Sequence, residues 1–114
     1  MPLAGLYITM IYGNMIDFGR IVGFQWDTGN DCKSEDKHGV SRAEAEQVFF
    51  NIPLRLAADE RHSGWEQRLH ALGRTDDGRI LHITFTLREA GQLIRVISAR
   101  DTNRKERGRY GKGS

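Results

Sequence analysis

The side chains best suited to chemistry gather between Arg68 and Arg109. Residues 79–88 alternate apolar and polar with period 2, which is typical of a strand with one buried face. Two neighbouring segments alternate in the same way, so a three-stranded sheet is predicted. Its polar face carries Arg68, His70, Arg74, His82, Thr84, Ser98 and Arg100. Cations and hydroxyls without a carboxylate suit a ligand that carries phosphate. The alternative is the solvated side of an antiparallel sheet, which is usually polar.

Turn signals set the register of these strands. A loop at Asp76-Asp77-Gly78 pairs Arg74 with Ile80, Leu72 with His82 and His70 with Thr84. A loop at Glu89-Ala90-Gly91 pairs Thr84 with Val96, His82 with Ser98 and Ile80 with Arg100. The apolar face then carries Leu69, Ala71, Leu81, Ile83, Phe85, Leu93 and Ile97. Arg95 falls on that apolar face, so it must reach solvent, pair with a carboxylate or mark the end of the sheet.

Charge is unevenly distributed along the 114 residues, which suffice for one domain with a modest core. The net charge is only +2, yet residues 95–112 hold seven Lys or Arg against two Asp or Glu. A basic end on a slightly acidic body predicts an acidic partner, either nucleic acid or protein. The single cysteine, Cys32, excludes an intramolecular disulfide and fits a reducing, cytoplasmic location.

The remaining elements predict an α+β fold. Residues 1–20 form a leader, either disordered or an added strand, and are too broken by Gly and Asn to span a membrane. A strand follows at 21–26, then a polar helix over 28–38. Ser41-Arg42-Ala43-Glu44 is a capping-box signature that begins a second helix, and Asn51-Ile52-Pro53 ends it. An edge strand over 53–57, a loop over 58–64, the meander and a helix over 103–110 capped by Thr102 complete a domain over 21–110, with a tail at 111–114. The helices should cover the apolar face of a 3–5-stranded, mainly antiparallel sheet.

The chain resembles the BrnT family of bacterial toxins in several short segments at family-like spacings. They are Phe24-Gln25-Trp26-Asp27, Lys37-His38-Gly39-Val40-Ser41, Ala71-Leu72-Gly73-Arg74-Thr75, Ile94–Arg100 and Arg104-Lys105-Glu106-Arg107. The leader is longer than usual for that family, and Gln25 stands where an acidic residue is common. The resemblance implies a RelE-like ribonuclease toxin that blocks translation. It also implies a BrnA-type antitoxin that neutralises the toxin and carries the DNA-binding module, so DNA would be contacted only through the antitoxin.

Metal-free RNA cleavage needs a base, an acid and cations that stabilise charge on the phosphorane. We predict that Arg79 and Arg100 hold the scissile phosphate, with Arg68 and Arg74 flanking; Ser98 either forms a hydrogen bond with the phosphate or orients a neighbouring side chain. His38, by its family position, is the candidate acid or base; it could instead close a helix C-terminus. Further phosphate contacts are predicted from His70, His82, Arg95, Arg104 and Lys105, although both histidines also fit a plain surface role. No cofactor or metal site is expected.

A different class of function is also compatible with these residues. The chain could be a non-catalytic module that binds nucleic acid or antitoxin and acts as an operon co-repressor. The basic end fits both hypotheses, because RNA and an acidic antitoxin surface attract the same side chains. An exposed sheet face also makes a heteromeric complex plausible, including a homodimer within a heterotetramer. A comparison of RNA affinity with RNA cleavage would separate the two.

Overall fold

A five-stranded sheet forms the centre of the computed structural model, which describes residues 8–11, 14–17, 20–26, 39–59, 61 and 67–112. The strand order is β3-β7-β6-β5-β4. The bounds are β3 (Gly23–Gln25), β4 (Arg55–Asp59), β5 (Arg68–Arg74), β6 (Ile80–Arg88) and β7 (Leu93–Asp101). Neighbouring strands are antiparallel except β3, which runs parallel to β7, so the sheet is mixed. The predicted α+β class is confirmed.

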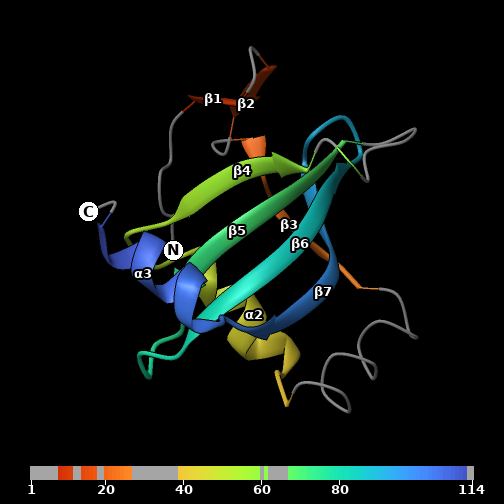
Figure 1. Ribbon diagram of the computed structural model, residues 1–114. Helices are drawn as coiled ribbons and strands as arrows, with labels where there is room; N and C mark the ends of the chain where they lie inside the picture. Colours follow the sequence, from red (N-terminus) through yellow and green to blue (C-terminus); the bar gives the residue numbers. More distant parts are fainter. Residues whose placement is uncertain are drawn as a thin grey trace.

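The described helices lie on opposite sides of this sheet, α2 (Arg42–Val48) behind it and α3 (Arg104–Lys112) across its front (Figure 1). A separate hairpin of β1 (Ile8–Ile11) and β2 (Asn14–Asp17) lies within the first twenty residues. The helix predicted over 28–38 lies outside the described residues. The face away from α2 is therefore the one on which a ligand can reach the sheet beside α3.

Helix α2 begins where the capping signature predicts. The Ser41 hydroxyl accepts a hydrogen bond from the Glu44 amide at 3.1 Å, and the Glu44 carboxylate accepts one from the Ser41 amide at 3.2 Å. These two bonds satisfy amides that a helix start leaves without partners. The helix buries Val48 completely, and the adjoining Phe49 ring meets the Phe85 ring edge-on at 5.1 Å. The apolar face of the sheet is thus covered as expected.

The first hairpin has the predicted register, with Arg74 opposite Ile80 and His70 opposite Thr84. The predicted register of the second hairpin is wrong. Its loop holds four residues, because Arg88 pairs with Leu93, and Glu89 and Ala90 both adopt left-handed φ angles of 54° and 55°. Two successive left-handed residues are typical of a type I′ turn, which the dipeptide Asn-Gly signals in a sequence. Glu and Ala rarely adopt this conformation, so the sequence did not predict the turn.

A β-bulge in the second hairpin changes which β7 side chains face the core. Thr84 pairs with Ser98 but Phe85 pairs with Val96, so Ile97 is an extra residue. Val96 is fully buried, whereas Ile97, which was predicted in the core, is only partly buried. Leu93 was also predicted in the core, but it is half-buried and its neighbour Ile94 is buried instead. Ala99, nearer the end of β7, is buried as well.

The same bulge removes the exception at Arg95. Arg95 pairs with Thr86, and Thr86 shares the parity of His82 and Thr84 along β6. Arg95 therefore belongs to the polar face of the sheet. In the second half of β7 the register is shifted by two residues, which preserves the predicted faces, so Ser98 and Arg100 stay on the polar face beside Thr84 and His82.

Helix α3 begins one residue later than predicted and has a different cap. The Asn103 side chain accepts from the Glu106 amide at 2.8 Å, and the Glu106 carboxylate accepts from the Asn103 amide at 3.0 Å. Thr102, which was predicted as the cap, instead donates its hydroxyl to the Ile80 carbonyl at 3.0 Å. Near the other end of α3, the buried Tyr110 donates its hydroxyl to the Pro53 carbonyl at 2.7 Å. These contacts fix α3 over one end of the polar face.

Candidate functional site

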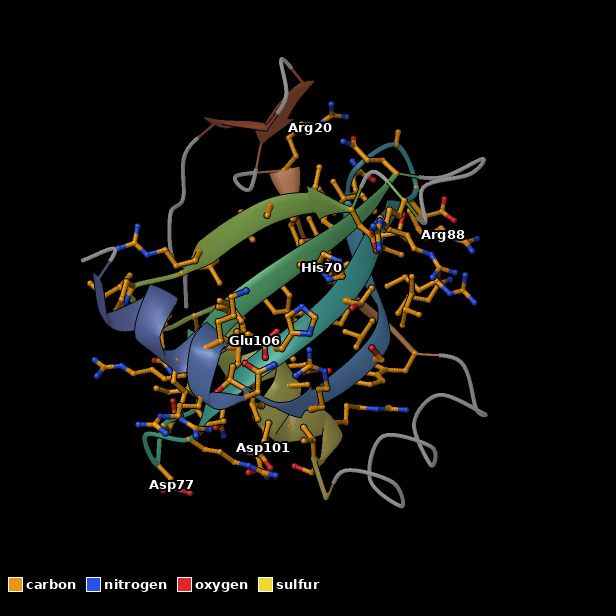
Figure 2. The ribbon with its side chains drawn as sticks, in the orientation of Figure 1. Arg20, His70, Asp77, Arg88, Asp101 and Glu106 are labelled. Atoms are coloured by element: carbon orange, nitrogen blue, oxygen red, sulfur yellow. The ribbon has the colours of Figure 1, made fainter. Side chains whose placement is uncertain are left out.

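Two histidines lie side by side at the centre of the polar face. The rings of His70 on β5 and His82 on β6 stack, with centroids 4.7 Å apart and planes inclined by 25°. Strand alternation brings both side chains to the same face, and the first hairpin sets them diagonally across the strand pair. Figure 2 shows the labelled His70 over the middle of the sheet, with Glu106 of α3 nearby.

His70 is held at both ring nitrogens. Its Nε2 lies 3.0 Å from the Asp59 carboxylate, and its Nδ1 lies 3.1 Å from the Thr84 hydroxyl. The carboxylate can only accept, so Nε2 carries a hydrogen, which leaves Nδ1 of the neutral ring to accept from Thr84. An imidazole oriented by a carboxylate is a common arrangement for a histidine that transfers protons.

The second histidine of the pair, His82, is partly buried, and it is neutral at pH 7. Burial, followed by the nearby Arg100 charge, lowers its pKa to about 4. Its Nδ1 is buried, and no described residue lies within hydrogen-bonding distance of it. A neutral imidazole can accept a proton from a ligand, so His82 has the protonation state that a general base requires.

Two adjoining pockets surround the histidine pair, and His70 lines both of them. The larger has a volume of about 620 Å³ and lies beside α3, lined by Arg55, Leu56, Ala57, His70, Leu72, His82 and Glu106. The smaller, of about 440 Å³, is lined by Asp59, Arg61, Arg68, His70, Thr84, Ile97 and Ser98. We call these two pockets together the groove: they share His70, Arg55 lines one, and Arg61 and Arg68 line the other, which suits a chain of phosphates.

Arg100 borders this groove and is bound by α3. Its guanidinium donates to both oxygens of the Glu106 carboxylate, at 2.8 and 2.9 Å. This paired, charge-assisted contact lowers the pKa of Glu106 to about 2 and raises that of Arg100. A phosphate offers the same two-oxygen geometry as a carboxylate, so Glu106 occupies the position that a phosphate would take on Arg100.

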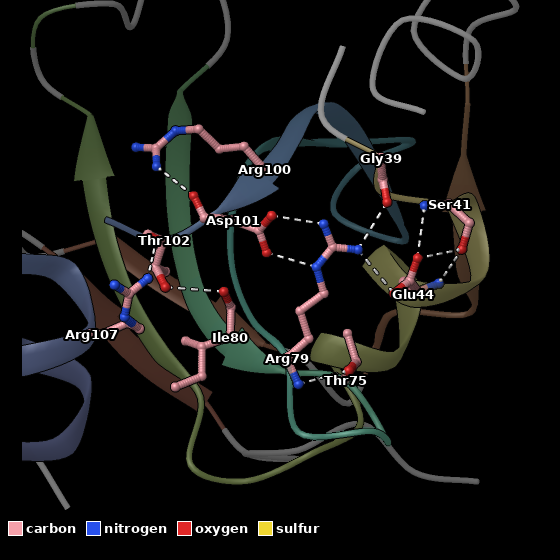
Figure 3. A network of polar contacts seen from close by, with 10 residues as sticks. All are labelled: Gly39, Ser41, Glu44, Thr75, Arg79, Ile80, Arg100, Asp101, Thr102 and Arg107. Atoms are coloured by element: carbon pink, nitrogen blue, oxygen red, sulfur yellow. Dashed lines mark hydrogen bonds and ion pairs between the residues drawn. The ribbon is translucent and has the colours of Figure 1, made fainter. Parts of the chain in front are cut away.

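Arg79 directly precedes β6 and reaches Glu44 of α2 (Figure 3). It shares the parity of Leu81 and Ile83, so it lies on the face away from the histidines. It donates to both carboxylate oxygens of Asp101 at 2.7 and 2.8 Å, to the Gly39 carbonyl at 2.9 Å and to Glu44 at 3.1 Å. Asp101 joins it to Arg100, whose guanidinium donates to the Asp101 carbonyl at 3.0 Å. The structure thus places Arg79 and Arg100 on different faces, and it does not bring them together around one phosphate.

The other predicted site residues divide between the groove and its surroundings. Arg68 and Ser98 line the smaller pocket beside His70. Arg74 is exposed at the end of β5, and Arg95 lies farther along the polar face beyond the bulge. Arg104 and Lys105 are exposed on the first turn of α3. His38 lies outside the described residues.

Two carboxylates, Asp59 and Glu106, belong to this face although the sequence pattern did not place them there. The expected absence of Asp and Glu from the polar face is wrong for this reason. Asp59 was assigned to a loop, but β4 extends to it and pairs it with Arg68. The alternation of Arg55, Ala57 and Asp59 was the available signal. Glu106 reaches the face from α3, and no local sequence pattern predicts such a tertiary contact.

Within the described ranges, no group of three or more His, Cys, Asp or Glu side chains is placed to hold a metal ion. None of the helices in the described part of the chain is long and apolar enough to cross a membrane.

Comparisons with known proteins identify the family. Residues 26–106 match the family described as the ribonuclease toxin BrnT of type II toxin–antitoxin systems. The fold is similar to the crystal structure of the Brucella abortus ribonuclease toxin BrnT, with a TM-score of 0.57 and 20% identity over 73% of this chain and 99% of that chain. A search of curated proteins finds no match. Because the family match spans most of the sequence and the fold agrees with it, this chain belongs to the BrnT family of ribonuclease toxins.

Proposed function

We propose that this toxin is an endoribonuclease that cleaves RNA in the groove on the polar face of its sheet and thereby inhibits translation. The observation that carries the proposal is the stacked His70–His82 pair, with His70 oriented by Asp59 and arginines on either side. The groove offers acid–base groups and phosphate-binding cations within one continuous surface. Those are the two requirements of RNA cleavage by attack of the 2′-hydroxyl.

The geometry supports a division of roles between the histidines. His82, neutral and with an unpartnered Nδ1 among the described residues, accepts the proton of the 2′-hydroxyl. As the acid, His70 donates a proton from Nδ1 to the leaving 5′-oxygen; for this it carries protons on both ring nitrogens and gives up the hydrogen bond from Thr84, while Asp59 holds Nε2 in place. His38, implied by the family resemblance, remains a further candidate acid or base outside the described residues. No step in this scheme uses a metal ion.

Arg68 and Arg100 are the cations placed to stabilise charge on the phosphorane, with Ser98 as a hydrogen-bond donor. Arg100 must first exchange the Glu106 carboxylate for the phosphate. Arg79 supports this site indirectly, because its two hydrogen bonds to the Asp101 carboxylate fix the end of β7 that carries Arg100. Arg74, Arg95, Arg104 and Lys105 extend the basic surface along which the RNA continues.

A cognate antitoxin of the BrnA type neutralises the toxin in this proposal. The exposed basic residues of α3, Arg104 and Lys105, suit an acidic antitoxin surface. The complex would contact operator DNA through the antitoxin. We place the toxin in the cytoplasm, where its RNA substrate and its antitoxin are found.

One observation favours the alternative, a non-catalytic binding module. The bidentate contact of Glu106 with Arg100 closes one end of the groove. A protein that kept this contact in the presence of RNA would bind the antitoxin without cleaving RNA. In that case expression would not slow growth, and RNA would stay intact.

Expression in bacteria, with growth, protein synthesis and RNA integrity followed together, tests the proposal. Wild type and the matched variant Arg20→Met should stop protein synthesis and fragment RNA, because exposed Arg20 lies outside the groove. His70→Asn and His82→Asn, expressed to the same level, should do neither. Growth arrest by folded histidine variants would assign the chemistry elsewhere, and intact RNA with wild type would favour the binding module.

A further inference from the structure

The larger pocket has more volume and more lining residues than the cleavage step requires. It lies between strands β4, β5 and β6 and helix α3, and its volume of about 620 Å³ falls in the range that holds a small-molecule-sized group, roughly 300–1,000 Å³. The reacting groups proposed above need only His70 and His82, at one side of it. The rest of the lining comes from residues that the cleavage step does not use directly: Arg55, Leu56, Ala57, Leu72 and Glu106.

The walls of this pocket combine apolar and aromatic surface. Ala57 and Leu72 supply aliphatic contacts from β4 and β5, and the stacked imidazoles of His70 and His82 supply aromatic ones. Proteins that read single-stranded RNA place aromatic and apolar side chains of a sheet against unstacked bases. A phosphate alone would gain nothing from contact with apolar and aromatic side chains.

Polar atoms in the same pocket lack partners. The Arg55 Nε and the His82 Nδ1 are buried, and neither has a hydrogen-bond partner among the described residues. The Glu106 carboxylate adds an acceptor at the edge, although Arg100 and the Asn103 amide already use part of its capacity. A buried donor beside an apolar wall fits a ligand that is flat, largely apolar and polar at one edge.

The position of the pocket identifies that ligand. It shares His70 with the smaller pocket, where Arg68 and Ser98 would hold the backbone of the RNA. We propose that the larger pocket is a base-reading subsite, which takes the nucleobase next to the cleaved bond. Leu72 and the imidazoles contact the face of the base, and Arg55 donates to an acceptor on its edge. This inference rests on the proposed function, and it makes Arg55 a specificity-determining residue.

Mapping of cleavage products tests the role of Arg55. The purified full chain cleaves an RNA pool with a randomised segment, and the product ends are sequenced for wild type, Arg55→Met and Arg20→Met. Wild type and Arg20→Met should enrich one base at one position beside the cleaved bond. Arg55→Met should still cleave but lose most of that enrichment. An unchanged profile in Arg55→Met, or no enrichment in wild type, overturns the inference.

A binding measurement with wild type alone makes the test independent of how Arg55→Met folds. A short RNA with a 2′-O-methyl group at the attacking position cannot be cleaved, and its affinity is compared with that of the same RNA lacking the base beside the blocked bond. Loss of a stacked base should weaken binding roughly tenfold. Equal affinities contradict the subsite. Failure of wild type to cleave any RNA would instead count against the proposed function, so the two failures are distinguishable.

Discussion

At the scale of single residues, the site depends on two histidines in unequal environments. His70 contacts Asp59 and Thr84 through its ring nitrogens, whereas His82 lies close to the Arg100 charge and burial keeps it neutral at pH 7. A carboxylate that orients one imidazole and burial that keeps the other neutral are what the proposed acid and base require. The alternation along β5 and β6 predicted that both histidines share a face with Ser98 and Arg100. It could not predict the ring stacking or the Asp59 contact, because both depend on how three strands meet.

The low pKa of His82 should make stability depend on pH. Between about pH 6.5, its ordinary pKa, and about pH 4, its folded pKa, the unfolded chain binds a proton that the folded chain does not. The free energy of unfolding should therefore fall as the pH falls through this window, by about 1–2 kcal/mol after allowance for solvent screening. Denaturant titrations at several pH values should show this loss in wild type, and a much smaller one in His82→Asn. Equal losses would contradict the assignment.

At the scale of elements, close packing holds α2 against the sheet and charge holds α3. Gly73 on β5 lies so near α2 that an added Cβ would be 2.6 Å from the Val48 Cγ1 and 3.2 Å from its carbonyl oxygen. The capping box predicted where α2 begins, because that signal is local. The second hairpin was harder to predict, because its four-residue loop and the bulge at Thr84/Phe85 have no distinct residue signature. The Glu106–Arg100 contact joins α3 to β7, so no local sequence pattern could predict it.

Gly73→Ala should destabilise the fold, by about 1–3 kcal/mol, because the methyl group overpacks the contact with Val48. The same substitution at Gly108, in α3, provides a matched control. Nothing lies within 4 Å of a Cβ there, and alanine favours a helix by up to about 1 kcal/mol over glycine. Chemical denaturation of the two variants should therefore shift in opposite directions. A neutral Gly73→Ala would mean that α2 does not approach β5 this closely.

Glu106→Gln should separate the structural role of the Arg100 contact from its effect on RNA. The contact stabilises the fold above about pH 4.5, and this part is lost as the pH falls towards the folded pKa of about 2. The variant should lack that pH-dependent part of the free energy of unfolding. At pH 7 it should bind RNA more tightly than wild type, because a neutral amide competes less well with phosphate for Arg100. Fluorescence anisotropy measures this, and weaker binding would contradict the competition between Glu106 and phosphate.

At the scale of the whole molecule, the fold gathers positive charge on one face although the net charge of the chain is small. The net charge is only +2, but Arg55, Arg61 and Arg68 border the pockets of one face, and α3 adds Arg104 and Lys105 beside it. The order of elements and their alternation sufficed to predict the α+β class and the polar face. They did not predict the contacts that occupy Arg79, because its partners Gly39, Glu44 and Asp101 come from three separate segments.

RNA binding should weaken steeply as salt is added, because bound phosphates release counterions. For a single strand, each neutralised phosphate contributes about −0.7 to the slope of log affinity against log salt. Arg68→Gln should therefore reduce the steepness by about 0.7, whereas Arg20→Gln should leave it unchanged. Affinities of an uncleavable RNA at four or more salt concentrations measure both slopes. Identical slopes for wild type and Arg68→Gln would remove Arg68 from the phosphate path.

The most direct measurement is the chemistry of the RNA ends that the purified full chain produces, beside His82→Asn and Arg20→Met, with EDTA present throughout. Attack by the 2′-hydroxyl in the histidine groove predicts 2′,3′-cyclic phosphate and 5′-hydroxyl ends from wild type and Arg20→Met. A folded His82→Asn should cleave at least about 100-fold more slowly, the usual contribution of a general base. Ends with 3′-hydroxyl and 5′-phosphate groups, or wild-type cleavage by His82→Asn, would contradict the account.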